Sequence, residues 1–128
     1  MAVTVYREQN QVKWIGVRPG HNGEQVLIDI DTAVSVIVYT VPADKLLFLF
    51  DWSISTVANL NIHSRLQIRT AVPVVVANIA GASSYTGDSG TNNTQALWVP
   101  IEIEAGYDIY LVATGATRGY IHGILIDA

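Results

Sequence analysis

The stretch VSVIVYTVPADKLLFLFDWSI, residues 34–54, contains two apolar segments separated by a short polar turn. Pro42 presets the φ angle that a turn over residues 42–45 needs, and Asp44 can bond its own backbone, so the chain is expected to reverse direction here. After the turn, apolar residues recur with the period of two that is typical of a β-strand. The stretch therefore predicts two consecutive strands joined by a tight turn.

The strand after the turn is expected to be buried on both faces. The residues at its even positions are all apolar and are predicted to point toward the core: Leu46, Phe48, Phe50, Trp52 and Ile54. Its odd positions begin with Leu47 and Leu49 before they become polar at residues 51, 53 and 55. A strand that is apolar on both faces is covered on both faces. In a chain of this length we expect the second cover to be another copy of the chain, which predicts Leu47 and Leu49 at an interface between copies.

The rest of the sequence also predicts an all-β protein, because its apolar segments alternate or are β-branched and turn signals recur at short spacing. Strands are expected near residues 25–30, 34–41, 46–56, 62–70, 72–79, 96–104, 107–114 and 119–127. In the strand near 62–70, polar residues alternate with apolar ones, so one face of this strand should be exposed to solvent; the polar residues are Arg65, Gln67 and Arg69. Ala105-Gly106 predicts a tight hairpin. Eight short strands with uneven connections favour a jelly-roll-like antiparallel β-sandwich.

Residues 1–24 differ from the rest of the chain and predict an extended N-terminal arm, which leaves residues 25–128 for the sandwich domain. The arm mixes isolated apolar residues with polar ones and ends in a loop-like stretch at residues 18–23, RPGHNG. One short strand is expected around residues 14–17. Such a segment is too sparse to build its own core, so Trp14 and Ile15 are predicted to anchor it in a neighbouring copy.

Composition narrows the possible functions. The chain has 128 residues, of which 50% are hydrophobic and only 14% charged, so part of its surface is expected to be covered by protein and the chain to self-associate. The net charge of -4, without a Lys/Arg cluster, argues against nucleic acid as a partner. No apolar run approaches the ~20 residues of a membrane span, so we expect no membrane insertion. The N-terminus does not resemble a signal peptide, so we expect the protein to be made in a cytoplasm.

No metal site or cofactor is predicted. The chain has no cysteine, which excludes thiolate ligands. Its three histidines, at positions 21, 63 and 122, lack the spacing of a metal motif.

Residues 81–95, GASSYTGDSGTNNTQ, are small and polar and predict a long surface loop. Loops on a rigid sandwich often carry function. Tyr85 within the loop and Trp98 just after it are candidate platforms for a sugar ring. These residues support one alternative function, a carbohydrate- or receptor-binding module.

A second alternative is an aspartic protease. The stretch VLIDIDTAVSVI, residues 26–37, resembles the active-site strand of retroviral-type aspartic proteases, in which an apolar run leads into Asp-Thr-Gly-Ala. Ala33 stands where that family has the glycine of the tight loop beneath its paired carboxylates. With that departure we predict no catalytic residues and a protein that is not an enzyme.

The turn at residues 40–45, TVPADK, and the strand that follows it resemble structural proteins of tailed-phage virions. The hairpin PIEIEAGYDI, residues 100–109, and the C-terminal strand GYIHGILID, residues 119–127, are similar to the closing strands of the same jelly rolls. The resemblance implies a non-enzymatic capsid decoration, head-fibre or tail component that is usually trimeric. Its partners would be other copies of itself, a major capsid or tail protein and a host-surface glycan, and its location would be the virion.

Overall fold

The computed structural model describes residues 4–7, 13–16, 23–57, 60–86 and 92–128, with the backbone alone for residues 4–7, 13–16 and 92–99. Ten strands run along the chain: β1 (Thr4–Arg7), β2 (Lys13–Gly16), β3 (Glu24–Thr32), β4 (Val36–Thr40), β5 (Lys45–Thr56), β6 (Ile62–Arg69), β7 (Val75–Ser84), β8 (Asn92–Ile103), β9 (Asp108–Ala113) and β10 (Thr117–Asp127). Within these ranges no helix forms, and hence none long and apolar enough to cross a membrane.

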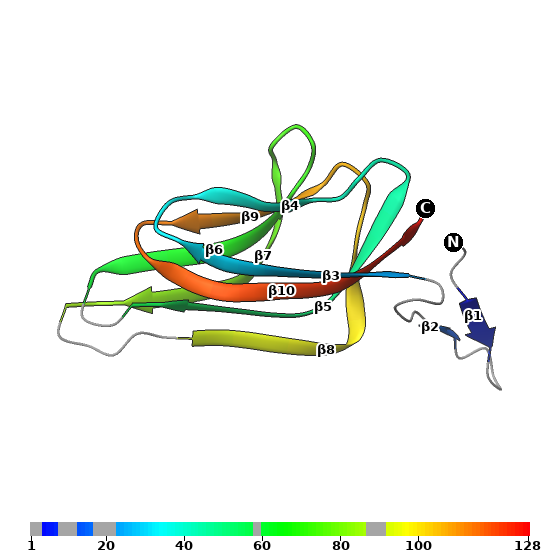
Figure 1. The fold of residues 1–128 in the computed structure, drawn as a ribbon, viewed down its shortest axis with the longest axis horizontal. Coiled ribbons are helices and arrows are strands. Elements are labelled where there is room, and N and C mark those ends of the chain that lie inside the picture. The colour runs from blue at the N-terminus through cyan, green and yellow to red at the C-terminus, as the bar shows by residue number, and fades with distance from the viewer. Residues whose placement is uncertain (1–3, 8–12, 17–22, 58–59, 87–91) are drawn as a thin grey trace.

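The last eight strands form two antiparallel sheets that face each other, with strand orders β3-β10-β5-β8 and β4-β9-β6-β7 (Figure 1). This order is that of a jelly roll, two interlocked Greek keys, so the predicted fold class is confirmed. Among the described sandwich strands, β6 and β7 are the only two that follow each other in the sequence and also pair in a sheet. The turn at Gly106 forms as predicted, with φ of 81°. The predicted hairpin is wrong, because β8 and β9 belong to different sheets.

The core lies between the two sheets. Each of the eight sandwich strands contributes described apolar side chains that face inward. The largest fully buried members of the core are Leu47, Leu49, Ile54, Leu66, Ile103, Ile109, Leu111 and Ile121. A second cluster of Phe48, Ile124 and Ile126 lies on the other face of the β5–β10 pair, with Leu46 and Phe50 packed against it. The first half of β5 is therefore buried on both faces, as its sequence predicts.

A β-bulge at Phe50 reverses the faces of β5. Leu49 is opposite Gly123 and Asp51 is opposite His122, so Phe50 is an extra residue against β10. Before the bulge the odd positions point into the core, and after it the even positions do. The prediction that all even positions from 46 to 54 share the core face is therefore wrong.

The bulge also corrects the predicted interface. Leu47 and Leu49 are 0% exposed within a single chain, because they face the opposite sheet of the same sandwich. A second copy cannot contact them. Phe50, predicted to be a central core aromatic, is half-buried on the outer face.

Two more predictions change with the structure. The N-terminal segment holds two paired strands where one was predicted, since Val5 pairs with Ile15 and Tyr6 with Trp14. The predicted loop at 81–95 begins and ends as strand, since β7 continues to Ser84 and β8 begins at Asn92. The small side chains of this segment can be buried: Ser84 is 0% exposed.

The turn between β4 and β5 has the predicted position and an unusual backbone. Lys45 N donates to Pro42 O at 3.2 Å, and Asp44 at the third position has φ of 62°. This left-handed conformation costs an L-residue free energy that glycine does not lose. The aspartate therefore occupies a position that favours glycine.

Asp44→Gly is expected to raise the free energy of unfolding by about 0.5–1 kcal/mol, because it relieves this backbone strain. Ala43→Gly is the matched control and should lower it by a similar amount, since the φ angle of residue 43 is negative. Urea denaturation followed by circular dichroism measures both. Destabilisation by both substitutions would contradict the prediction.

Candidate functional site

The outer face of the β4-β9-β6-β7 sheet carries a polar surface. Along β6, Ser64, Leu66 and Ile68 are buried toward the core, and the residues between them point outward. The outward residues are His63, Arg65, Gln67 and Arg69. The wet face predicted from residues 65, 67 and 69 is therefore confirmed, although Gln67 is covered by neighbouring side chains and is 7% exposed.

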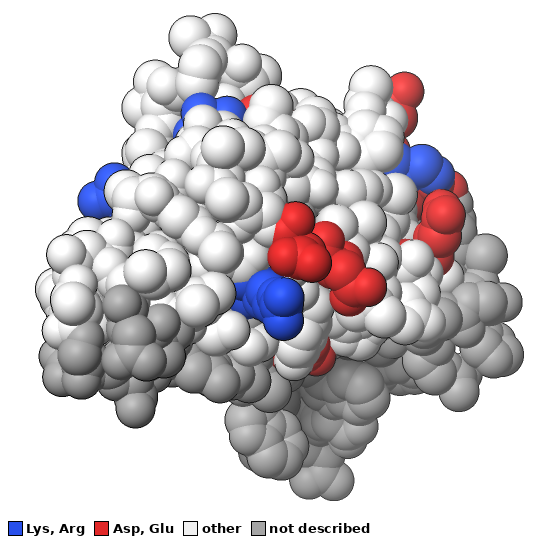
Figure 2. Space-filling model, turned by 60° about the vertical axis from the view of Figure 1, so that its left-hand side comes forward, with Lys and Arg blue, Asp and Glu red and all other residues white. Residues whose placement is uncertain are grey.

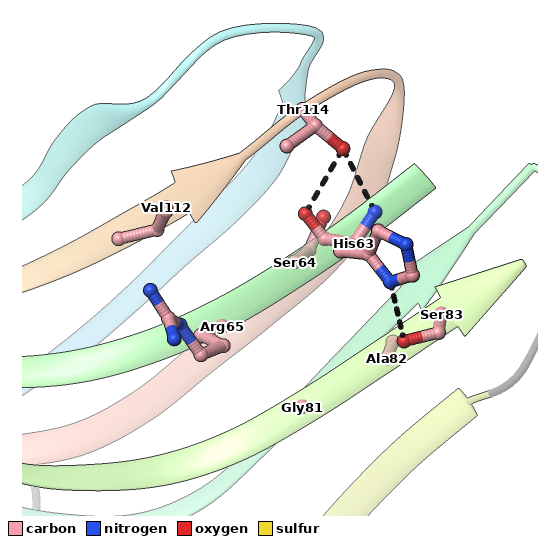
Figure 3. A pocket seen from close by; sticks show the side chains of 8 residues that line it. All are labelled: His63, Ser64, Arg65, Gly81, Ala82, Ser83, Val112 and Thr114. Atoms are coloured by element: carbon pink, nitrogen blue, oxygen red, sulfur yellow. Dashed lines mark hydrogen bonds between the residues drawn. The ribbon is translucent and has the colours of Figure 1, made fainter. Parts of the chain in front are cut away.

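An open depression of about 400 Å³ lies at one end of this face (Figure 3). The strand register arranges its walls in two rows. Arg65 lies between Val112 of β9 and Gly81 of β7, and His63 lies between Thr114, just after β9, and Ser83 of β7. Three strands thus contribute to one site, which the sequence order of these residues does not suggest.

Hydrogen bonds hold the His63 row in place. The His63 ring nitrogen Nδ1 is 3.2 Å from Ser83 Oγ. On the other side, His63 N donates to Thr114 Oγ1 at 2.8 Å, and that hydroxyl donates to His63 O at 3.3 Å. Tyr85 packs edge-on against the imidazole, with ring centroids 5.3 Å apart. The backbone of His63 is therefore held from the Thr114 side, while Ser83 and Tyr85 orient the imidazole.

Arg65 supplies a positive charge that no described residue compensates. Within the described part of the chain its guanidinium has no ion pair and no hydrogen bond. The four strands of this sheet contain a single carboxylate, Asp108, and that carboxylate is bound to Arg69 at 3.3 Å. Gly81, opposite Arg65, leaves the floor of the depression open, since a Cβ at this position would have Ser64 O as its nearest neighbour, at 3.9 Å.

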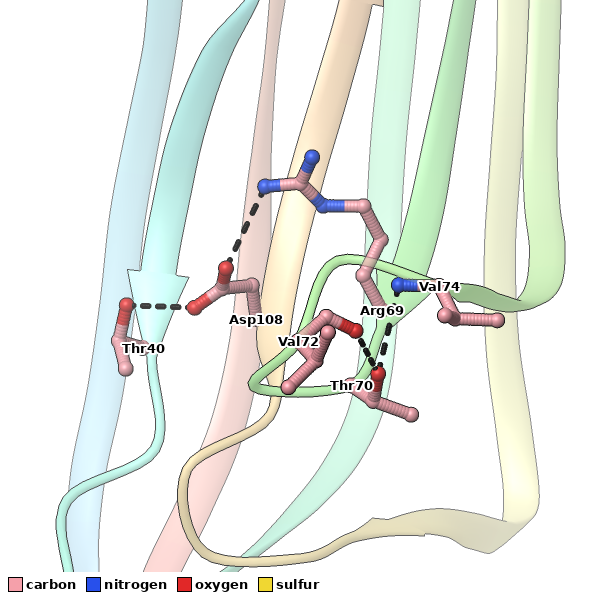
Figure 4. A network of polar contacts seen from close by, with 6 residues as sticks. All are labelled: Thr40, Arg69, Thr70, Val72, Val74 and Asp108. Atoms are coloured by element: carbon pink, nitrogen blue, oxygen red, sulfur yellow. Dashed lines mark hydrogen bonds and ion pairs between the residues drawn. The ribbon is translucent and has the colours of Figure 1, made fainter.

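A polar network closes the other end of the same face (Figure 4). Asp108 accepts from Arg69 and from Thr40 Oγ1, the latter at 2.8 Å. The Arg69 guanidinium lies 3.6 Å from the centroid of the Tyr110 ring. The side chains of Arg69 and Asp108 are 16% and 13% exposed, so solvent screens this ion pair less than a surface pair. The network fixes the base of the β6–β7 hairpin.

The tip of this hairpin is apolar and exposed. It stands above the sandwich as the green loop in Figure 1, and its exposed valines, here the valine tip, are Val72, Val74, Val75 and Val76. Val72 is 77% exposed. Thr70 holds the loop, because its Oγ1 donates to Val72 O and accepts from Val74 N at 3.3 Å (Figure 4). The valines are thus presented to solvent on a bonded turn.

A second apolar surface lies where β3 and β4 form the edges of their sheets. Its exposed residues, here the β3–β4 edge, are Leu27, Val34, Val36 and Ile37. A groove of about 220 Å³ runs between the two strands, and both apolar and polar residues line it: Ile28, Ile30, Val36, Ile37 and Val38, with Asp29, Asp31 and Thr32. On the face of the molecule drawn in Figure 2, charged side chains lie in small groups with wide uncharged areas between them.

The structure tests only some of the predicted site residues. Tyr85 is 49% exposed and lies beside the depression, against His63. The side chains of Trp98, Trp14 and Ile15 lie outside the described residues. Trp52 is 3% exposed in the core, as predicted. Sequence reasoning missed His63, Arg65 and Ser83 as a group, because residues 81–95 were predicted to be a loop, whereas β7 continues beside β6 as far as Ser84.

The other chemical candidates find no support in the geometry. Asp31 lies within β3, 78% exposed and 3.6 Å from Arg118, where the protease interpretation needs a loop beneath paired carboxylates. His63 and His122 are on different sheets, and His122 Nδ1 is 3.0 Å from Asp51 Oδ2. His21 lies outside the described residues. Among the residues described, no three metal-binding side chains lie close enough to hold an ion.

Two solved structures show a distant likeness to this chain. No family model matches the sequence, and no curated protein matches it. A chain in the structure of infectious bursal disease virus Gx strain is similar over 95% of this chain and 36% of that chain, with 10% identity and a TM-score of 0.41. A chain in the structure of the Gt strain is similar over 95% and 37%, with 10% identity and a TM-score of 0.33. This chain thus spans little more than a third of the solved chains it matches, and a likeness of this degree carries no information about function.

Proposed function

We propose that this protein is a non-enzymatic structural component of a virus particle, which self-associates as a homotrimer and docks on a major capsid or tail protein. The observation that carries the proposal is the apolar surface that one copy leaves in water, the valine tip and the β3–β4 edge. Surface of this kind marks contacts with other proteins. The low charge content and the sequence resemblance to tailed-phage virion proteins support the same function.

The two apolar surfaces favour a head-to-tail contact. They belong to different parts of one chain, so the valine tip of one copy can pack on the β3–β4 edge of the next. A head-to-tail contact repeated around a symmetry axis closes into a ring, for which we propose three copies. Residues 1–24 are proposed to assist as an arm outside the sandwich domain, 25–128, with Trp14 and Ile15 as anchors, because β1 and β2 bond to neither sandwich sheet.

Replacement of the valine tip is expected to break the assembly. The double substitution Val72→Asp and Val74→Asp should reduce the mass in solution toward the 13.9 kDa of one copy, because it places charges in the contact. Folding should change little, since substitutions at exposed positions usually alter stability by under about 0.5 kcal/mol. Multi-angle light scattering at micromolar concentration measures the mass. A wild-type mass near 13.9 kDa would contradict self-association.

Two controls sharpen this experiment. Leu60→Asp changes a residue that is 53% exposed at the other end of β6, and it should leave the mass unchanged. Val34→Asp on the β3–β4 edge should break the assembly as the tip variant does. A mixture of the tip variant and the edge variant restores one intact contact, so it should form heterodimers if the contact is head-to-tail and none if tips pair with tips.

The location in the virion has its own test. Mass spectrometry of purified virus particles that encode this protein should recover its peptides in fixed ratio to the main shell protein. Peptides confined to the host lysate would contradict a structural role, whatever the result in solution.

A further inference from the structure

We propose that the depression around His63 and Arg65 binds a sugar that carries a carboxylate, at the end of a glycan chain. The site is independent of the proposed assembly, since it lies on an open sheet face and not at the valine tip or the β3–β4 edge. Its volume of about 400 Å³ is within the range of small-ligand sites and suits a single sugar ring.

The charge of the site selects an anion. Arg65 is exposed and has no partner within the described chain, although the protein as a whole is acidic with a net charge of -4. A guanidinium presents two parallel N–H groups that match the two oxygens of a carboxylate. The one carboxylate of this sheet, Asp108, is bound to Arg69, so it does not neutralise Arg65.

The backbone of the site disfavours a phosphate. Sites for phosphate commonly use several unpaired backbone N–H groups, at a helix N-terminus or in a nest. Here β6 is an inner strand that pairs on both sides, with β7 and with β9, so its ladder takes up the backbone groups around residues 63–65. One guanidinium, without free backbone donors from β6, fits the single charge of a carboxylate better than the double charge of a phosphate.

The rest of the lining suits a sugar ring. The imidazole of His63 is oriented through Nδ1 by Ser83, which leaves Nε2 without a partner among the described residues and available to a sugar hydroxyl. Val112 in the lining offers apolar surface for the C–H face of a sugar, and so does the exposed ring of Tyr85, which packs against His63 beside the depression. Gly81 keeps the space between Arg65 and Ser83 open, as Figure 3 shows. A carboxylate on Arg65 and a hydroxyl on His63 would orient one ring across this floor.

Titrations followed by amide chemical shifts test the site in the full chain. Two carboxylated probes, methyl β-glucuronide and the methyl glycoside of N-acetylneuraminic acid, are compared with methyl β-glucoside and with sodium acetate. At least one carboxylated sugar should shift the amides of His63, Arg65, Gly81 and Ser83, and both controls should bind about tenfold more weakly or worse. Equal binding of the glucoside would overturn the role of the carboxylate, and equal binding of acetate would reveal an adventitious ion only. No shift with either carboxylated sugar would overturn the site.

Three variants complete the test. Arg65→Gln keeps a polar side chain without the charge and should weaken binding about tenfold or more. Gly81→Val fills the floor and should abolish binding while the protein stays folded, because its Cβ would meet no atom closer than 3.9 Å. Arg118→Gln removes the same charge from the other sheet, where Arg118 is 75% exposed, and should leave the affinity unchanged. Loss of affinity in Arg118→Gln equal to that in Arg65→Gln would mean that net charge and not this site attracts the probes.

Discussion

Truncation of Leu49 to alanine is expected to lower the free energy of unfolding by about 3–5 kcal/mol, a large part of the stability of a domain this size. The side chain is 0% exposed between the two sheets, and the rigid strands around it cannot close the cavity that alanine leaves. Phe50→Ala is the matched comparison one residue later. It removes a larger side chain, but one that is half-buried on the outer face, so it should cost only about 1–2 kcal/mol.

Urea denaturation of both variants at equal protein concentration tests the bulge directly. An uninterrupted period of two would put Phe50 in the core and reverse the order of the two effects. A larger loss for Phe50→Ala than for Leu49→Ala would therefore contradict the observed register between β5 and β10.

Gly119→Ala is expected to prevent folding or to destabilise the sandwich by about 3 kcal/mol or more, at the upper end of the cost of overpacking. A Cβ at this position in β10 would lie 1.8 Å from Ser53 O and 2.7 Å from the carbonyl carbon of the same residue. These atoms belong to the backbone of the neighbouring strand β5, so no side-chain rotation can make room. The two strands would have to separate at the centre of their sheet.

Gly81→Ala in β7 is the control, because a Cβ there meets only Ser64 O at 3.9 Å. This change should leave the melting temperature unchanged or slightly higher, since glycine in a strand is less stable than alanine by about 0.5–1 kcal/mol. Soluble yield and thermal unfolding by circular dichroism compare the two variants. Equal behaviour of Gly119→Ala and Gly81→Ala would contradict the close approach of β10 to β5.

Local patterns determined the elements of this fold. Alternation of apolar residues predicts all eight sandwich strands, and Pro42 and Gly106 mark two of the turns that join them. These features depend on side-chain periodicity and on backbone preferences of single residues, both of which are present in any short window of sequence. The jelly-roll class follows from the number and spacing of such strands.

Only part of the candidate site could be predicted from the sequence. Alternation along β6 predicts an outward face with Arg65, and Tyr85 was a candidate for ligand binding. That this face lies beside Ser83 and Thr114 depends on pairing of β6 with β7 and with β9, whose residues are 20 and 51 positions from His63. The small residues of β7 conceal this pairing, since their burial comes from neighbouring strands and not from their own hydrophobicity.

The sequence by itself determined that β5 is buried on both faces, but only the tertiary structure decided which face is the core. The deciding contact joins residues far apart: Gly123 of β10 is opposite Leu49, and a Cβ there would lie 2.6 Å from Phe48 O. The missing side chain lets β5 accommodate Phe50 as an extra residue, and the bulge turns Leu47 and Leu49 inward. Because a strand alternates with a period of two, one inserted residue exchanges its faces, and no pattern within β5 records the insertion.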